Sequence, residues 1–208
     1  MELQITTFMA DGDHREALRL MAEHYAAPVS RFCASMVGSP AEAEELMQET
    51  FLDAWNAMPS YRADSNVRAW LYGIARRVCI RHLRRRDRRV GLLQRWLAPQ
   101  QVAAPPADPT ERMDAEKLLR QGLQALKPEL RQAVLLRYQV GLDGPEIAVA
   151  LNIRPATARK RLSLGIQSLR ETLRPLLMEP AEPKSQENQD DQKPDSLRAV
   201  AGPRIVRP

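Results

Sequence analysis

The sequence predicts an all-α protein, with two small helical domains joined by a flexible linker and followed by a disordered C-terminal tail. Apolar residues recur at helical spacings of three and four through residues 13–97 and again through residues 111–178. Residues 98–110 are rich in proline and alanine and lack that periodicity, as expected of a linker. Residues 179–208 are polar, proline-rich and free of aromatic residues, which favours disorder.

The first forty residues are predicted to contain two helical segments. Residues 1–12 are expected to be a loose lead-in. A first helix follows and ends near Pro28, and a second apolar segment covers Val29–Val37 and stops at Gly38.

The next helix begins with an N-terminal signal. Ser39 is a candidate N-cap, Pro40 stands at the first helical position, and Glu42 falls three residues after the cap. Pro59 ends the helix. Its spacing buries Ala43, Leu46, Met47, Thr50, Phe51 and Ala54, and it exposes Glu45, Gln48, Glu49 and Asp53.

The most basic stretch of the chain is Tyr61–Arg89, which holds ten arginines and two acids. Helical spacing from Val67 gives it an apolar stripe and, beside that stripe, a line of Trp70, Arg77, Arg81, Arg84 and Arg88. Guanidiniums pair with phosphates and aromatic rings stack on unpaired bases, so we interpret this helix as a nucleic-acid surface. The alternative is a solvated arginine-rich face.

The C-terminal unit is predicted to start with two further helices. The first begins around Glu111 and places on one side Met113, Leu118, Leu119, Leu123 and Leu126. The second has Pro128 in its first turn, ends at Gly141, and carries the apolar set Leu130, Val134, Leu135 and Tyr138.

Two more helices joined by a tight turn follow. Asp143 and Glu146 predict a capping box, Asn152 supplies the turn, and Pro155 starts the second helix. The early turns of that helix present Arg154, Thr157, Arg159, Lys160 and Ser163. This arrangement is typical of a helix-turn-helix that enters the DNA major groove, and the alternative is an αα-hairpin within a bundle.

Charge is distributed unevenly along the chain. Residues 1–60 contain three basic and ten acidic groups, whereas residues 61–97 contain eleven basic and two acidic groups. This favours a protein partner for the acidic part and nucleic acid for the basic part. No signal peptide is recognisable and no uncharged apolar run approaches ~20 residues, so we expect a soluble cytoplasmic protein without membrane insertion.

Neither catalysis nor metal binding is predicted. His14, His24 and His82 are scattered, and no nucleophile–base or paired-carboxylate pattern stands out, so we expect no catalytic residues, no metal site and no cofactor. Cys33 and Cys79 are too few and too far apart for a disulfide framework. We interpret each as a small core residue, with a redox switch as the alternative.

Two stretches together resemble a known family. They are AEAEELMQETFLDAWNAMPSYRADSNVRAWLYGIARR in the first half and LLRYQVGLDGPEIAVALNIRPATARKRL in the second. The first is similar to an acidic helix ending in QETF that precedes an R-x-D-S loop and W-L, and the second to a G-L-S-x-x-E-I-A…T-V-x-x-R-L pattern. Both patterns, in this order, are those of extracytoplasmic-function (ECF) sigma factors of bacterial RNA polymerase.

The resemblance implies a promoter-melting domain over residues 13–97 and a helix-turn-helix domain over residues 111–178. It implies bacterial core RNA polymerase and promoter DNA as partners, with an anti-sigma factor as an optional one. The residues it assigns to polymerase binding are Glu45, Gln48, Glu49 and Asp53. Those it assigns to the −10 element are Tyr61, Arg62, Asp64, Ser65, Asn66, Trp70, Arg76, Arg77, Arg81 and Arg84, and those for the −35 element are Arg154, Thr157, Arg159, Lys160 and Ser163.

The chain departs from the family pattern at several positions. Arg77 replaces a common asparagine and Arg81 a frequent aspartate, so Arg77 either reads a base or holds a phosphate. Two other functional classes compete with a sigma factor: an enzyme, and a free-standing helix-turn-helix regulator. A free-standing regulator has no need of the acidic helix with Gln48 and Glu49.

Overall fold

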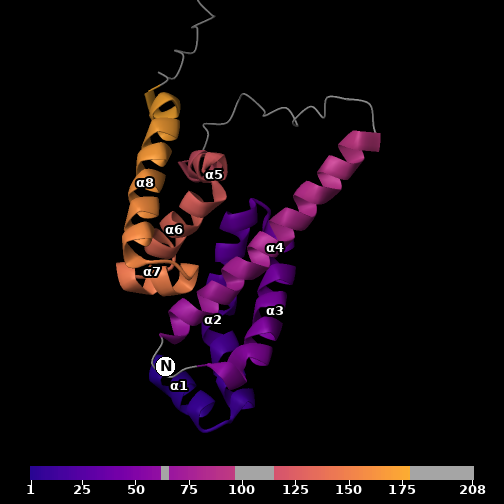
Figure 1. Ribbon diagram of the computed structural model, residues 1–208, viewed down its shortest axis with the longest axis vertical. Helices are drawn as coiled ribbons and strands as arrows, with labels where there is room; N and C mark the ends of the chain where they lie inside the picture. The colour runs from indigo at the N-terminus through magenta and orange to yellow at the C-terminus, as the bar shows by residue number, and fades with distance from the viewer. Residues whose placement is uncertain (62–65, 97–114, 179–208) are drawn as a thin grey trace, which may run out of the picture. The chain divides into compact units, whose positions relative to one another are not determined.

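The computed structural model of the protein describes residues 1–61, 66–96 and 115–178, and within them every regular element is a helix (Figure 1). Predictions about residues 62–65, 97–114 and 179–208 lie outside the described residues. The helices are α1 (Glu2–Ala10), α2 (His14–Val37), α3 (Pro40–Ala57), the 3₁₀ turn η1 (Met58–Ser60), α4 (Val67–Trp96), α5 (Ala115–Ala125), α6 (Pro128–Tyr138), α7 (Gly144–Leu151) and α8 (Pro155–Met178).

The prediction of a loose lead-in is wrong, because residues 2–10 form α1. Ile5 and Met9 lie one turn apart on this helix and are both buried. The Tyr25 hydroxyl donates to Glu2 Oε1 at 2.9 Å and so joins α1 to α2. With only nine residues, α1 depends on this packing and not on its own propensity.

The predicted break at Pro28 is also wrong, since α2 runs without interruption from His14 to Val37. Proline lacks an N–H and so removes one helical hydrogen bond. Tyr25, Val29 and Phe32 around it are buried, and their packing against neighbouring helices offsets that loss. Gly38 ends the helix at a φ of 80°, in the left-handed region that glycine adopts without strain.

The core of the first half lies between α2, α3 and α4. The Ser39 side chain accepts from the Glu42 N–H at 3.4 Å, which confirms the predicted start of α3. The rings of Phe32 and Tyr72 meet edge to face at 5.3 Å between centroids and join α2 to α4. Burial raises the pKa of the Tyr72 hydroxyl to about 12.

Cys33 and Cys79 also lie in this core, fully buried on α2 and α4. Contact with the Cys33 thiol and burial together raise the pKa of Cys79. Since the thiolate is the reactive form of cysteine, this environment favours the interpretation of both residues as packing groups.

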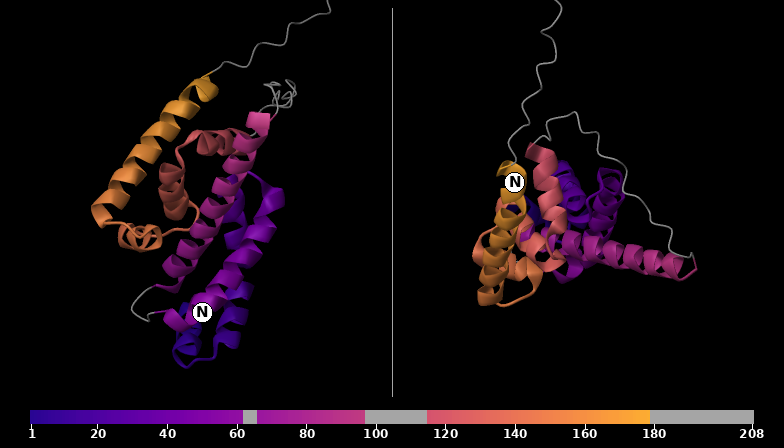
Figure 2. Two further views of the ribbon diagram at one scale, coloured as in Figure 1. Left: turned by 45° about the vertical axis from the view of Figure 1, so that its right-hand side comes forward. Right: turned by 90° about the horizontal axis from the view of Figure 1, so that it is seen from above.

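In the second half, α8 packs along α5 and α6 while α7 lies across its N-terminal end (Figure 2). The capping box is confirmed: Asp143 Oδ1 accepts from the Glu146 N–H at 2.8 Å, and Glu146 Oε2 accepts from the Asp143 N–H at 2.7 Å. Leu119 and Tyr138, both expected on buried faces, are instead 45% and 67% exposed. They line an apolar groove of about 840 Å³ between α5, α6 and α8, which these helices leave open to solvent.

Residues up to Met178 form one compact unit. The contacts that join its two halves run from α4 to α7 and from the end of α2 to α5 and α6. The contacts of α4 are made by Asn66 at its start and by Gly73 and Arg76 within it.

Candidate nucleic-acid interface

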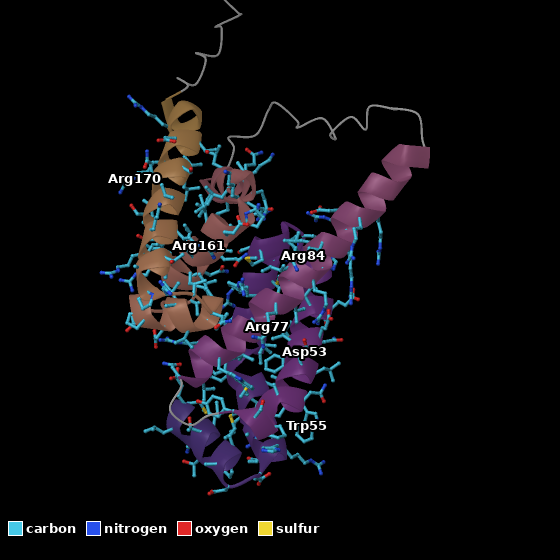
Figure 3. The ribbon with its side chains drawn as sticks, viewed as in Figure 1. Asp53, Trp55, Arg77, Arg84, Arg161 and Arg170 are labelled. Atoms are coloured by element: carbon cyan, nitrogen blue, oxygen red, sulfur yellow. The ribbon has the colours of Figure 1, made fainter. Side chains whose placement is uncertain are left out.

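The basic helix α4 carries its exposed arginines on the side away from the core. Val67, Leu71, Ile74 and Val78 are buried as the sequence predicts, and Arg77 and Arg84 are exposed along the same helix (Figure 3). Arg88 is also exposed and donates from Nε to the Arg84 carbonyl at 3.2 Å. A row of exposed guanidiniums on one helix is a surface that DNA phosphates can bind.

An aromatic pair stands at the beginning of this row. The rings of Tyr61 and Trp70 contact each other at 5.2 Å between centroids and at a steep angle, and Trp70 is partly buried against the core. A partly exposed indole that is held in place by the core can stack on an unpaired base. Arg62, Asp64 and Ser65 of the predicted −10 set lie outside the described residues.

Asn66 begins α4 and has two roles. Its side-chain oxygen accepts from the Arg68 and Ala69 N–H groups at 2.8 and 3.2 Å, which caps the helix. Its side-chain nitrogen donates to Glu146 of α7. The amide that the resemblance assigns to the −10 element is therefore engaged within the protein.

Arg76 and Arg81 are also engaged, unlike Arg77 and Arg84. Arg76 is half-buried and donates from Nε to Gln132 of α6, and burial together with nearby arginines lowers the pKa of its guanidinium. Arg81 donates from Nη2 to Asp53 at 3.0 Å and also to Glu49, both on α3. These pairs raise the pKa of Arg81 and bind α4 to α3.

The outer face of α3 is acidic with an apolar centre. Glu45 and Gln48 are exposed, and Glu49 and Asp53 are half-exposed through their pairing with Arg81. Leu52 and Trp55 follow Glu45 and Gln48 by seven residues each, so they share this face. They are 65% and 42% exposed. The sequence pattern alone was not used to predict these two residues as part of the interface. Their position one heptad after exposed polar residues is nevertheless a recognisable sign of an interface, because large apolar side chains rarely cluster on a solvent-exposed face without a partner.

The helix-turn-helix consists of α7, a turn at Asn152 and α8. Asn152 has a φ of 53° and ends α7 in the left-handed region. The predicted recognition side chains are all exposed: Arg154 directly before α8, and Thr157, Arg159, Lys160 and Ser163 in its first turns. Ala158, on the opposite side, is buried and fixes the helix against the core.

Two family models match the chain: Sigma-70 region 2 over residues 21–89, and Sigma-70, region 4 over residues 116–169. RNA polymerase sigma factor CarQ of Myxococcus xanthus is 34% identical over 165 residues, which cover 78% of this chain and 91% of CarQ. The chain belongs to the ECF sigma factors. This confirms the resemblance, and it places the protein among non-catalytic transcription initiation factors.

Two further comparisons fit this sigma factor assignment. ECF sigma factor SigG of Mycobacterium tuberculosis is 30% identical over 191 residues, which cover 79% of this chain but only 52% of SigG. The solved structure of sigma factor RpoE from Bartonella quintana, in complex with the anti-sigma factor NepR, is 25% identical. It has a TM-score of 0.61 and covers 75% of this chain and 96% of RpoE.

The described part of this sigma factor offers neither a metal site nor a membrane span. Its histidines, cysteines and acids form no group of three or more that could hold a metal ion. None of its described helices combines the length and the hydrophobicity needed to cross a lipid bilayer.

Proposed function

We propose that this ECF sigma factor binds bacterial core RNA polymerase through α3 and directs it to promoters. In this proposal α4 and the loop before it take the melted −10 element, and α8 reads the −35 element. The two functions belong to residues 13–97 and 111–178, with residues 98–110 as the link between them. Because polymerase acts in the cytoplasm, the protein works there.

The exposed face of α3 supports this proposal most directly. An acidic face suits a basic protein surface and repels DNA phosphates. Its centre is Leu52, flanked by Trp55 on one side and Glu45 on the other, and aromatic and apolar anchors inside a charged rim are typical of protein interfaces. A free-standing DNA-binding regulator would have no use for this face.

The α4 surface supports the −10 assignment. Melted DNA offers both unpaired bases and phosphates, and α4 presents Trp70 for the former and Arg77 and Arg84 for the latter. The N-terminal turns of α8 support the −35 assignment, because in a helix-turn-helix the start of the second helix contacts base edges in the major groove. Thirteen linker residues, 98–110, reach roughly 45 Å when extended, so the two elements can be contacted together when they lie about one and a half helical turns apart.

An anti-sigma factor is a proposed partner as well, since RpoE of Bartonella quintana is bound by one. The apolar groove between α5, α6 and α8 is a suitable surface, because Leu123, Ile166 and Leu169 line it and Arg170 and Arg174 stand at its edge. An amphipathic helix with acidic flanks would match that combination.

Reconstitution with purified bacterial core polymerase tests the proposed function. The protein should co-elute with core enzyme in size-exclusion chromatography, and the complex should bind promoter fragments that neither component binds alone. If the protein elutes separately from core enzyme at micromolar concentrations, the proposed function is contradicted.

A further inference from the structure

We propose that the acidic face of α3 in one copy of this protein docks in the apolar groove of a second copy, so that the free protein associates head to tail. The groove is the one between α5, α6 and α8, and the face is the exposed side of α3 that carries Leu52 and Trp55. The inference goes beyond the proposed function, because it names a second copy of the chain as a partner.

The groove is a large apolar surface that the described part of the chain leaves uncovered. Leu119 of α5 and Tyr138 of α6 stand in it with 45% and 67% of their surface exposed. The wall from α8 consists of Ile166, Leu169 and Leu173, which share one side of that helix at spacings of three and four. Exposed apolar surface of this kind is typical of a place where another protein binds.

The edge of the groove is positively charged. Arg170 and Arg174 stand there one helical turn apart on α8, and both are exposed. Among the described residues neither guanidinium is paired with a carboxylate. The groove therefore favours an occupant that has acidic side chains beside its apolar ones.

The outer face of α3 has that composition. Leu52 and Trp55 are large, apolar and exposed in its C-terminal half. Glu44 and Glu45 are exposed in its N-terminal half and, unlike Glu49, they have no basic partner among the described residues. Aromatic and aliphatic anchors next to unpaired acids complement an apolar groove with an arginine edge.

The dimensions of the two surfaces agree. From Glu45 to Trp55 the face of α3 extends about 15 Å, because a helix rises about 1.5 Å per residue. From Ile166 to Arg174 the wall of the groove extends about 12 Å on the same basis. When the two helices run antiparallel, Trp55 lies beside Ile166. Glu45 then reaches Arg174 at the charged edge.

The interface is heterologous, because the face and the groove belong to different helices of the same chain. Docking of two copies leaves one groove and one α3 face free, so further copies can add. Two apolar anchors with exposed ion pairs form a small interface, and we expect a dissociation constant on the order of 10 μM. On the proposed function, a docked α3 is unavailable to polymerase, so self-association and polymerase binding exclude each other.

Sedimentation velocity of the full chain tests the proposal with two variants at exposed positions. Leu52→Lys alters the α3 face and Tyr138→Glu alters the groove, and each alone should weaken self-association by about ten-fold or more. An equimolar mixture should form a one-to-one dimer, because the first variant keeps its groove and the second keeps its α3 face. Leu3→Lys, at an exposed leucine of α1, is the matched control and should associate as wild type does. Far-ultraviolet circular dichroism verifies that each variant keeps its helix content.

Three results would be decisive. A wild-type protein that stays monomeric up to about 200 μM would overturn the proposal and leave the groove to another partner, such as an anti-sigma factor. A mixture of the two variants that stays monomeric, although wild type associates, would also overturn it. Excess core polymerase should dissociate the wild-type assembly. If the mixture dimerises but core polymerase binds no wild-type protein, the proposed function is contradicted and the self-association stands.

Discussion

Arg81 on α4 pairs with Glu49 on α3, although the family resemblance assigns the first to DNA and the second to polymerase. The Arg81 Nη2 atom lies 2.5 Å from Glu49 Oε1, and the same guanidinium reaches Asp53 at 3.0 Å. The basic and acidic helices are thus joined to each other at the border of their two surfaces. Because Arg81, Glu49 and Asp53 are paired with one another, the side chains available to a partner are mainly the other exposed residues of α3 and α4.

We predict that Glu49→Lys weakens association with core polymerase by about 1–3 kcal/mol, because it reverses a charge on the α3 face and leaves Arg81 opposite a second cation. Isothermal titration with core enzyme measures the effect. Glu23→Lys on α2, an equal change of charge at an exposed position, is the matched control and should bind normally. Wild-type affinity of Glu49→Lys would remove α3 from the interface.

We predict that Arg81 and Arg77 differ in their contribution to DNA binding. Arg81→Gln should lower the free energy of unfolding by about 1 kcal/mol or less, because its ion pairs are partly exposed. It should leave the slope of log K against log salt unchanged. Arg77→Ala should leave stability intact and reduce that slope by about one unit, as expected of a phosphate contact.

These two variants also decide between the alternatives for Arg77. A changed base preference at a single −10 position, with little change in slope, would show that Arg77 reads a base. If Arg81→Gln reduces the salt slope as much as Arg77→Ala, the ion pair with Glu49 opens on DNA, and the structural role of Arg81 is wrong.

We predict that Arg159 of α8 reads bases of the −35 element. Arg159→Ala should cost about 1–3 kcal/mol and relax the preference at one or two base pairs of the −35 element, because the side chain is exposed about one turn into the recognition helix. Selection from a library randomised at the −35 element measures this. Uniform weakening across all sequences would make Arg159 a phosphate contact instead.

We predict that Cys33 and Cys79 are unreactive in the native protein. Both are fully buried and the pKa of Cys79 is raised, so little thiolate is present at neutral pH. Labelling with a chromogenic disulfide reagent should proceed only at the rate of global unfolding. Rapid labelling, or a loss of DNA binding on peroxide treatment that a thiol reverses, would support the redox switch.

The ends of helices were predicted correctly where residues close together in the sequence determine them. Ser39 and Pro40 gave the start of α3, and Asp143, Glu146 and Asn152 gave both ends of α7, since caps and left-handed turns depend on residues within one turn of each other. The exposed set on α8 followed from helical spacing in the same way.

Features set by tertiary contact were missed. α1 has only Ile5 and Met9 as buried residues, too few to give a periodic signal, and α2 passes through Pro28 because packing outweighs one lost hydrogen bond. The pairing of Arg81 with Glu49 and the approach of Ala150 to Gly73 depend on how separate helices are placed, which spacing within one helix cannot reveal.

Promoter selection with reconstituted holoenzyme tests the central claim most directly. Purified core polymerase with this protein is given a DNA library randomised at both promoter elements, and the transcribed molecules are sequenced. The proposed function predicts two enriched sequence blocks, of which the −10 block is altered by Trp70→Ala and the −35 block by Arg159→Ala. Enrichment identical to that of core enzyme alone would contradict the assignment of these surfaces to promoter recognition.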